Sequence, residues 1–188
     1  MHTRQGMPGK IIFFTAPSGA GKTTLVKHLL ANDERLSFSI SATTRSRREG
    51  EVDGQDYYFL TNREFEEQLK DGGFVEYEEV YEGLYYGTLK SEISRIWSNG
   101  KHVVLDIDVK GGLSIQKHYP EQSLGVFIQP KDLETLENRL RGRGTEEDSE
   151  VKKRLERAAY EMSFAEQFDT VLVNDDLEQA KKEAQLLV

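Results

Sequence analysis

The sequence has no cysteine, which excludes a disulfide framework, a thiolate nucleophile and a zinc or iron–sulfur site with cysteine ligands. Basic residues are in the minority, because 25 lysines and arginines stand against 33 aspartates and glutamates, for a formal net charge of −8. This charge argues against a protein that coats nucleic acid or an anionic membrane, so a basic site must be local. The apolar run Ile11-Ile12-Phe13-Phe14 is too short for a signal sequence or a membrane span. We therefore expect a cytoplasmic protein with no nucleic-acid or membrane partner.

The length of the chain and the order of its apolar runs indicate one α/β domain. A chain of 188 residues, 37% hydrophobic and 31% charged, is typical of a folded unit with its own core. Short β-branched and aromatic runs alternate with helical stretches, a pattern that favours a parallel sheet covered by helices. The expected strands are Ile11–Thr15, His102–Ile107, Leu124–Ile128 and Thr170–Val173, with Phe38–Ser41 as a weaker fifth, and the expected helices are Lys22–Ala31, Leu89–Asn99, Asp132–Arg141 and Leu177–Leu187.

Two stretches interrupt this alternation and predict inserted segments. The first is rich in Arg, Tyr, Gly and Glu, and it includes a helix start at Thr61-Asn62-Arg63-Glu64 that fits a capping box. The second carries a series of basic residues around the Gly142-Arg143-Gly144 hinge, and it can move as a lid. We expect a tail over residues 1–9 and a single domain over 10–188, whose core comprises 10–40, 89–134 and 159–188, whose insert comprises 41–88 and whose lid comprises about 135–158.

The strongest motif is Ala16-Pro17-Ser18-Gly19-Ala20-Gly21-Lys22-Thr23, which lies between an expected strand and an expected helix. This is the context of a phosphate-binding loop, although alanine replaces the first glycine of the motif. In such a loop, backbone N–H groups and the start of the helix bind anions, Lys22 places a positive charge at the β- and γ-phosphates, and Thr23 holds Mg²⁺. Ala16 is tolerated if its φ angle is negative. The alternative is a glycine-rich turn formed by chance.

Two aspartates in Leu105-Asp106-Ile107-Asp108 come at the end of an expected strand. They should lie at the carboxyl edge of the sheet beside the phosphate loop, where one of them can hold Mg²⁺ or its water. Strand alternation predicts that Asp106 and Asp108 share one face while Ile107 points to the core. The alternative for Asp108 is that it caps the next helix near Gly111.

A cluster of arginines at Arg45, Arg47 and Arg48 indicates a second anion site. Three guanidinium groups within four positions repel one another unless an anion lies among them, and their planar forks suit phosphate oxygens. Seen alone, such a run is more often a solvated face. The phosphate loop upstream favours a second phosphate site.

Six motifs in one order resemble the guanylate kinase family, the kinases that phosphorylate GMP. They are Ser41–Arg48, Gly50–Tyr57, Tyr85–Thr88, Leu105–Asp108, Arg141–Gly144 and Val173–Asp176, and the resemblance extends from Ile11 to about Val188. It implies a P-loop NTPase-type three-layer sandwich with a parallel core sheet, in which 41–88 is the GMP-binding insert. It also implies that the γ-phosphoryl group of ATP is transferred to GMP, and also to dGMP, with Mg²⁺ in purine nucleotide metabolism. At Ala16 the chain departs from the family's usual loop but is similar to a bacterial variant.

The resemblance also assigns residues to the two nucleotides. The ATP residues are Ala16 to Thr23 of the phosphate loop, Thr24 and Asn174, and the GMP residues are Ser41, Arg45, Arg48, Tyr57, Glu76, Tyr86, Gly87, Thr88 and Asp108. The same resemblance implies a catalytic set of Lys22, Arg45, Arg139, Arg143 and Arg154, and a metal site at Thr23 and Asp106.

The chemistry of guanine agrees with these assignments. Guanine presents N1–H and N2–H₂ as donors and O6 as an acceptor, so Glu76 can accept from the base while Ser41 or Thr88 donates to O6. Adenine presents the reverse pattern. The acceptor phosphate is already largely ionised at neutral pH, because its second pKa is about 6, so the reaction needs no side-chain general base.

The residues alone leave open other interpretations of these positions and of the function of the chain. Glu76 can be a solvated strand residue, and Tyr85 and Tyr86 can serve packing. The chain can also be a phosphopeptide-binding module that resembles the family, although such modules usually have a degraded phosphate loop. A third reading is a P-loop kinase that acts on another small phosphorylated acceptor. An acidic surface is compatible with a monomer or a homo-oligomer.

Overall fold

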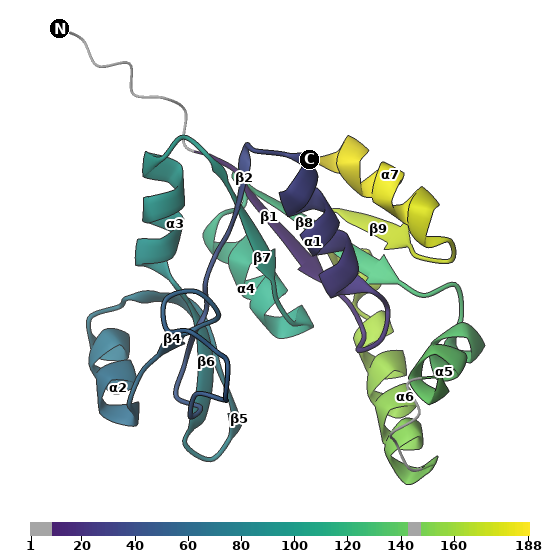
Figure 1. Cartoon of the computed structure of the whole chain (residues 1–188), viewed down its shortest axis with the longest axis horizontal. Coiled ribbons are helices and arrows are strands. Elements are labelled where there is room, and N and C mark those ends of the chain that lie inside the picture. Colours follow the sequence, from purple (N-terminus) through teal and green to yellow (C-terminus); the bar gives the residue numbers. More distant parts are fainter. Residues whose placement is uncertain (1–8, 143–147) are drawn as a thin grey trace, which may run out of the picture.

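The computed structural model of the chain describes residues 9–142 and 148–188. Its core is a sheet of five parallel strands in the order β2-β7-β1-β8-β9 (Figure 1). β1 is the central strand and is buried along its whole length. The carboxyl end of β1 therefore lies in the middle of the sheet edge at which α/β proteins bind ligands. The strands are β1 (Ile11–Thr15), β2 (Leu36–Phe38), β7 (His102–Asp106), β8 (Ser123–Gln129) and β9 (Thr170–Val173).

Side chains of β1 fill two cores, one on each face of the sheet. Ile12 and Phe14 belong to one core, whereas Ile11 and Phe13 belong to the other. Because successive strand residues point to opposite faces, a strand buried on both faces needs a continuous apolar run. The helices α1 (Lys22–Asn32) and α7 (Leu177–Leu187) close the first core, and α3 (Lys90–Ser98), α4 (Val109–His118) and the short 3₁₀ helix η1 (Ala165–Gln167) close the second.

The chain segment between β2 and α3 forms a second sheet of four strands, in the order β4-β3-β6-β5. Its helix packs through Phe65, whose ring stacks on Phe74 and Tyr85 at centroid distances of 4.3 and 5.2 Å. That helix begins at the expected capping box, in which Thr61 and Glu64 bond reciprocally. The elements are β3 (Ala42–Thr43), β4 (Tyr58–Phe59), α2 (Asn62–Lys70), β5 (Phe74–Tyr81) and β6 (Leu84–Leu89).

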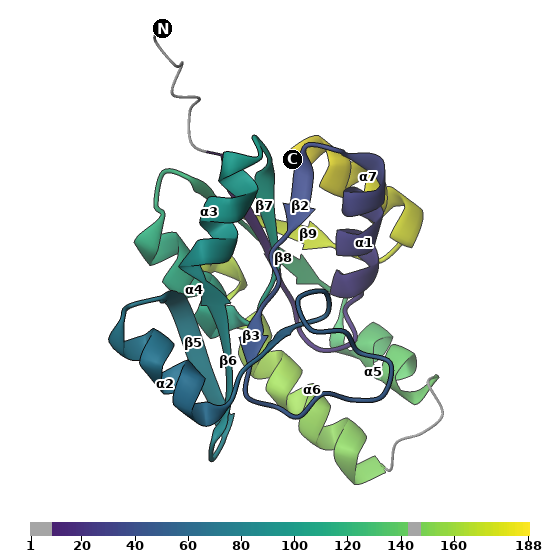
Figure 2. The same ribbon diagram turned by 60° about the vertical axis from the view of Figure 1, so that its left-hand side comes forward.

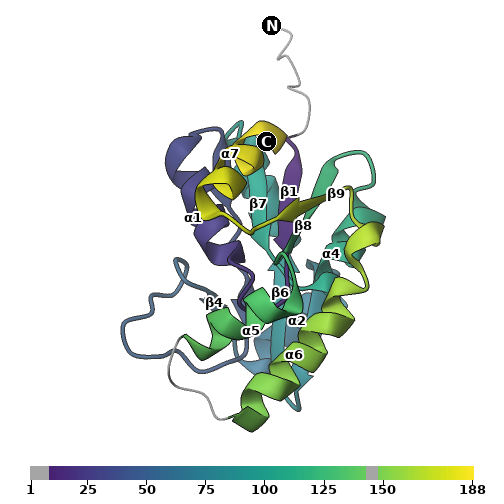
Figure 3. The same cartoon turned by 90° about the vertical axis from the view of Figure 1, so that its right-hand side faces the viewer.

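The helices α5 (Leu133–Arg141) and α6 (Asp148–Met162) form a pair that packs through Leu136, Leu140 and Ala158. This pair and the second sheet lie on either side of the carboxyl edge of the core sheet (Figures 1 and 2), and α5 and α6 lie side by side (Figure 3). In the ranges that the structure describes, no helix has both the length and the apolar content of a transmembrane span.

The four expected core strands are present, and Ile11–Thr15 and Thr170–Val173 have the predicted bounds. The strand predicted over Phe38–Ser41 is wrong, because β2 ends at Phe38 and residues 39–41 cross to the second sheet. His102–Ile107 is one residue too long, since Ile107 follows the end of β7. The helix α6 and the hairpin of β5 and β6 were not predicted from periodicity.

Candidate active site

The phosphate-binding loop joins β1 to α1 at the carboxyl edge of the core sheet. Gly19 and Gly21 have φ angles of 94° and 97°, a region that favours glycine. A Cβ on Gly21 would also overlap Nδ2 of Asn174. In the described part of the chain only glycines have positive φ, so the condition under which Ala16 is tolerated is met. The first turn of α1 has no side-chain cap among the described residues, and the Thr24 N–H donates to the Gly21 carbonyl at 3.1 Å, which leaves the N–H groups ahead of Thr24 for an anion.

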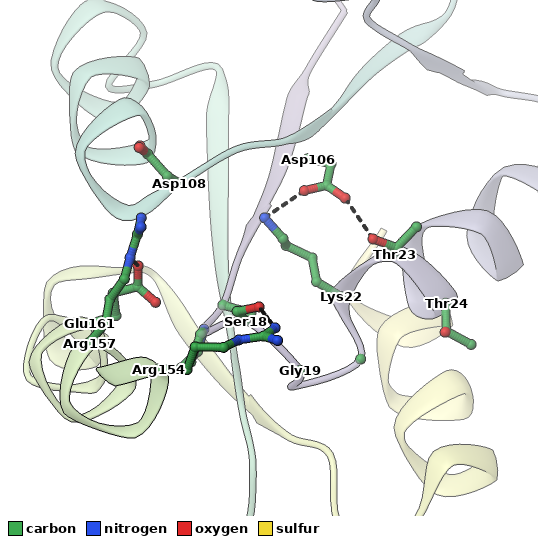
Figure 4. Close-up of a pocket in the computed structure, with 13 residues that line it drawn as sticks. Ser18, Gly19, Lys22, Thr23, Thr24, Asp106, Asp108, Arg154, Arg157 and Glu161 are labelled. Atoms are coloured by element: carbon green, nitrogen blue, oxygen red, sulfur yellow. Dashed lines mark hydrogen bonds and ion pairs between the residues drawn. The ribbon is translucent and has the colours of Figure 1, made fainter. Parts of the chain in front are cut away.

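Asp106 at the end of β7 links the two residues that follow the loop (Figure 4). Its Oδ1 lies 2.5 Å from Lys22 Nζ, and its Oδ2 accepts a hydrogen bond of 3.3 Å from Thr23 Oγ1. Lys22 Nζ also donates to the carbonyl of Ile107 at 3.0 Å. The strand and the helix thus place one ammonium, one hydroxyl and one carboxylate at the same point of the sheet edge.

The residues at this point fit a magnesium ion. Hydroxyl and carboxylate oxygens are hard donors, and Mg²⁺ in nucleotide sites is held by few protein ligands together with phosphate oxygens and water. Thr23 Oγ1 and Asp106 Oδ2 already approach each other. The described residues contain no cluster of three or more His, Cys, Asp or Glu suited to a metal ion. Thr23 and Asp106 therefore suit a metal ion that binds together with the phosphates of a nucleotide.

A cavity of about 680 Å³ opens over the phosphate loop. Arg154 of α6 reaches across it and donates a 2.5 Å hydrogen bond to Ser18 Oγ (Figure 4). Arg157, one turn further along α6, also lines the cavity, and its Nε donates to Glu161 at 2.9 Å. The full lining is Ala16, Pro17, Ser18, Gly19, Gly21, Lys22, Thr23, Thr24, Asp106, Asp108, Arg154, Arg157 and Glu161.

Three described residues that were assigned to the ATP site or to the lid do not line this cavity, namely Ala20, Asn174 and Arg139. Asn174 is 3% exposed, and its Nδ2 donates to the carbonyl of Ala20, which is itself buried. Arg139 donates to the carbonyls of Asn174 and Asp175 at 2.8 and 3.2 Å. Through Asn174, these hydrogen bonds connect α5 to the phosphate loop. Arg143 lies outside the described residues.

A second cavity, of about 200 Å³, lies between the second sheet and the end of β7. Glu76 and Thr88 stand on paired strands, and Thr88 Oγ1 donates to Glu76 Oε1 at 2.6 Å. Burial raises the pKa of Glu76, and the nearby Asp108 adds to the increase. Seven of the residues assigned to GMP line this cavity, namely Ser41, Tyr57, Glu76, Tyr86, Gly87, Thr88 and Asp108.

The two assigned arginines lie outside the lining of both cavities. The Arg45 guanidinium forms a 2.7 Å ion pair with Glu51 and lies 5.3 Å from the ring centroid of Tyr57. Hydrogen bonding to Arg45 lowers the pKa of Glu51 to about 2. Arg48 is exposed, and its backbone N–H donates to Glu51 Oε2. Glu51 thus occupies the guanidinium fork that the resemblance assigns to a phosphate.

Asp108 corrects the expectation that it shares a strand face with Asp106. It lies beyond β7 and caps α4, where its Oδ1 accepts a 2.7 Å bond from the Gly111 N–H. The alternative prediction, a helix cap, is therefore confirmed. Burial acts to raise the pKa of Asp108, but hydrogen bonds from Glu78 and the Gly111 N–H outweigh it and hold the pKa below its usual value. Ile107 does pack against the core, as expected.

The Glu78 carboxyl should make stability depend on pH. Its hydrogen bond to Asp108, together with burial, raises its pKa from 4.5 to about 7. The folded state then binds more protons than the unfolded state between these two values, so the free energy of unfolding falls as pH rises through this window. Glu78→Gln keeps an amide donor for Asp108 but cannot titrate.

We therefore expect the midpoint of thermal unfolding to fall less between about pH 5 and 8 in Glu78→Gln than in the wild type. Circular dichroism melts across this range measure the difference. Glu82→Gln is the matched control, because Glu82 is an exposed carboxylate near the tip of the same hairpin. A variant slope equal to that of the wild type would show that Glu78 does not titrate in this window.

Residue-by-residue reasoning did not assign Arg157, Glu161 or Glu78 to the site. The signal for Arg157 was its position three residues after Arg154, which places both guanidinium groups on one face of a helix. Glu161 comes four residues after Arg157, which places it on the same face of the helix. Glu78 had no such signal, because its role depends on Asp108, which lies 30 positions later in the chain (108 − 78 = 30).

The parallel sheet, the glycine loop before α1, and the lysine and aspartate at the sheet edge define a P-loop NTPase fold. The family model "Guanylate kinase" matches residues 8–188. The guanylate kinase of Chlorobium chlorochromatii is 53% identical over 90% of this chain and 88% of its own length, and that of Bacteroides thetaiotaomicron is 50% identical over 94% and 87%. The crystal structure of guanylate kinase from Anaplasma phagocytophilum superposes with a TM-score of 0.72 at 32% identity, covering 96% of this chain and 85% of that one. The chain belongs to the guanylate kinase family.

Proposed function

We propose that each of the two cavities holds one substrate of the family's reaction, the ATP-dependent phosphorylation of GMP. ATP binds in the larger cavity over the phosphate loop, and GMP binds in the smaller cavity against the second sheet. One observation carries this division: Asp106 and Asp108 line both cavities, so the two sites meet at the carboxyl edge of the core sheet. Such a junction lets an acceptor phosphate approach the terminal phosphate of ATP.

On the ATP side, the loop N–H groups and the start of α1 bind the phosphates, and Lys22 neutralises the charge of the γ-phosphoryl group. The Lys22 ammonium already reaches the sheet edge at Asp106 and Ile107. Thr23 and Asp106 would hold Mg²⁺, which when bound neutralises charge on the phosphate oxygens. Asn174 supports the loop from below through its bond to Ala20.

On the GMP side, Glu76 accepts hydrogen bonds from the N1–H and N2–H₂ groups of guanine, while Ser41 donates to O6, because the single hydroxyl proton of Thr88 already goes to Glu76. Asp108 lines the same cavity, as do Tyr86 and Gly87. We assign the phosphate of GMP to Tyr57 and Tyr86, together with Arg45 and Arg48. Arg45 supports this assignment because its guanidinium lies over the Tyr57 ring.

The transfer itself requires alignment of two anions and stabilisation of the charge between them, and no side chain has to remove a proton. Arg154 already lies across the ATP cavity on α6, and we assign Arg139 and Arg143 to the same lid. We propose that the segment 135–158 acts as this lid and that 41–88 acts as the GMP-binding insert, closing together to exclude water. Both nucleotides are found in the cytoplasm, where we place the reaction.

A coupled assay that measures ADP release tests the assignment. ATP and Mg²⁺ are offered with GMP, dGMP, AMP, UMP and CMP in parallel. We expect turnover with GMP and dGMP, and activity lower by about 10⁴-fold with AMP, because a site that hydrogen-bonds one base leaves polar groups unpaired against another. Equal activity with GMP and AMP would contradict the assigned base contacts. Activity restricted to another acceptor would contradict the proposed function.

A further inference from the structure

Glu92 is a carboxylate that is almost fully buried and lies outside both cavities. It is 2% exposed in the first turn of α3. The chain enters the second sheet through residues 39–41 and leaves it through β6, which runs directly into α3. Glu92 therefore lies where both connections between the two sheets come together.

The carboxylate of Glu92 holds three different segments. Its Oε2 accepts the Ile40 N–H at 3.1 Å, and its Oε1 accepts the Tyr58 hydroxyl at 2.8 Å. Arg95, one turn along α3, donates to both oxygens at 2.7 and 2.9 Å. Ile40 belongs to the connection out of the core sheet and Tyr58 belongs to β4, so one side chain joins α3, the connection and the second sheet.

The charge of Glu92 is balanced where it lies. Burial alone would raise the pKa of its carboxyl, but hydrogen bonds from Arg95, the Ile40 N–H and Tyr58 outweigh burial and keep the pKa below its usual value. The group is therefore an ionised acceptor. Because a buried charge is costly unless it is paired and hydrogen-bonded, the three partners together offset the cost of burying it.

Two partners of Glu92 are adjacent in sequence to residues that line the GMP cavity. Ile40 precedes Ser41 and Tyr58 follows Tyr57, and both Ser41 and Tyr57 line the cavity. The Tyr58 N–H donates to the Ser41 carbonyl at 2.9 Å, which binds the two segments to each other. We propose that Glu92 is a positioning residue for GMP, which fixes Ser41 through Ile40 and Tyr57 through Tyr58. The inference rests on the proposed function, in which Ser41 and Tyr57 contact GMP.

Glu92→Gln and Tyr58→Phe test this role. Glu92→Gln puts an amide donor where the structure needs an acceptor, so we expect the KM for GMP to rise about tenfold while the KM for ATP stays within about twofold. Tyr58→Phe removes only the hydrogen bond between Tyr58 of β4 and Glu92, and we expect the KM for GMP to rise about threefold. Because both variants act through one carboxylate, the double variant should be less impaired than the product of the two single effects.

Steady-state kinetics for each nucleotide, GMP titration calorimetry and thermal melts are measured together. Glu67→Gln is the control, because it removes a carboxylate from an exposed ion pair with Arg63 on α2 of the second sheet. A rise in both KM values by the same factor, or a lower melting temperature with both KM values unchanged, would show a merely structural role and overturn the inference. If Glu92→Gln does not fold, Tyr58→Phe decides alone, since it keeps the ion pair with Arg95.

Two further variants separate this inference from the proposed function. Ser41→Ala and Tyr57→Phe change the cavity lining directly. If they raise the KM for GMP and Glu92→Gln does not, only the role of Glu92 is refuted. If neither changes GMP binding, the assignment of GMP to this cavity fails, and the inference about Glu92 fails with it.

Discussion

Lys22→Ala is expected to lower kcat by about a thousandfold, with both nucleotides saturating, because it removes a positive charge from the point at which charge develops on the transferring phosphoryl group. The Lys22 ammonium lies 2.5 Å from Asp106 and 3.0 Å from the Ile107 carbonyl, at the junction of the two cavities. Its side chain is 19% exposed and packs in neither core, so the fold should remain intact. Initial rates of ADP release measure the loss.

Lys27→Ala is the matched control for this experiment. Lys27 is on the same helix but is exposed and lines neither cavity. The Lys27→Ala substitution removes the same charge from α1 and should leave kcat near the wild-type value. A Lys22→Ala enzyme with near-normal turnover would remove Lys22 from the mechanism. Melting curves of both variants show whether a loss of rate reflects a loss of fold.

The core sheet could be predicted because local signals determine it. Ile11–Thr15 reads as a strand buried on both faces, and the glycines after it mark the turn into α1. The second sheet could not be predicted in this way. Its strands β3 and β4 have two residues each, and they exist because they pair with each other and β3 pairs with β6, which lies more than 40 positions away. Periodicity within a window carries no information about such pairing.

The phosphate loop could likewise be located from sequence, because its residues are contiguous. The surroundings of the site depend on distant contacts instead. Asp108 was expected beside Asp106 on a strand, but the cap of α4 turns it toward Glu78 on the second sheet. Glu92 gave no signal at all, since its partner Ile40 lies 52 positions away. Side chains whose role depends on long-range partners are those that sequence reasoning missed.

Glu76 is the residue on which base selection should depend most strongly. It stands on β5 opposite Thr88 of β6, and Thr88 occupies one of its oxygens at 2.6 Å. The other oxygen, Oε2, is 3.1 Å from the position that a Cβ on Gly111 would take, so the absence of a side chain at Gly111 leaves room there. A carboxylate held in this way presents a fixed acceptor to a base with two neighbouring donors.

Glu76→Gln is expected to raise the KM for GMP by about a hundredfold and to leave the KM for ATP nearly unchanged, because an amide nitrogen would face the donors of guanine. The carboxyl must be ionised to accept from the base, and burial raises its pKa. Protonation therefore weakens binding as the pH falls. The KM for GMP should rise toward acidic pH more steeply in the wild type than in the variant, and steady-state kinetics at several pH values measure both effects.

Glu82→Gln controls for the loss of one negative charge, because Glu82 is exposed near the tip of the same hairpin. It should leave the KM for GMP and its pH dependence as they are in the wild type. GMP also titrates on its phosphate, with a pKa of about 6, so only the difference between wild type and variant reports on Glu76. If Glu76→Gln affected ATP and GMP equally, the carboxylate would serve the packing of the second sheet and guanine would have to be recognised by other groups.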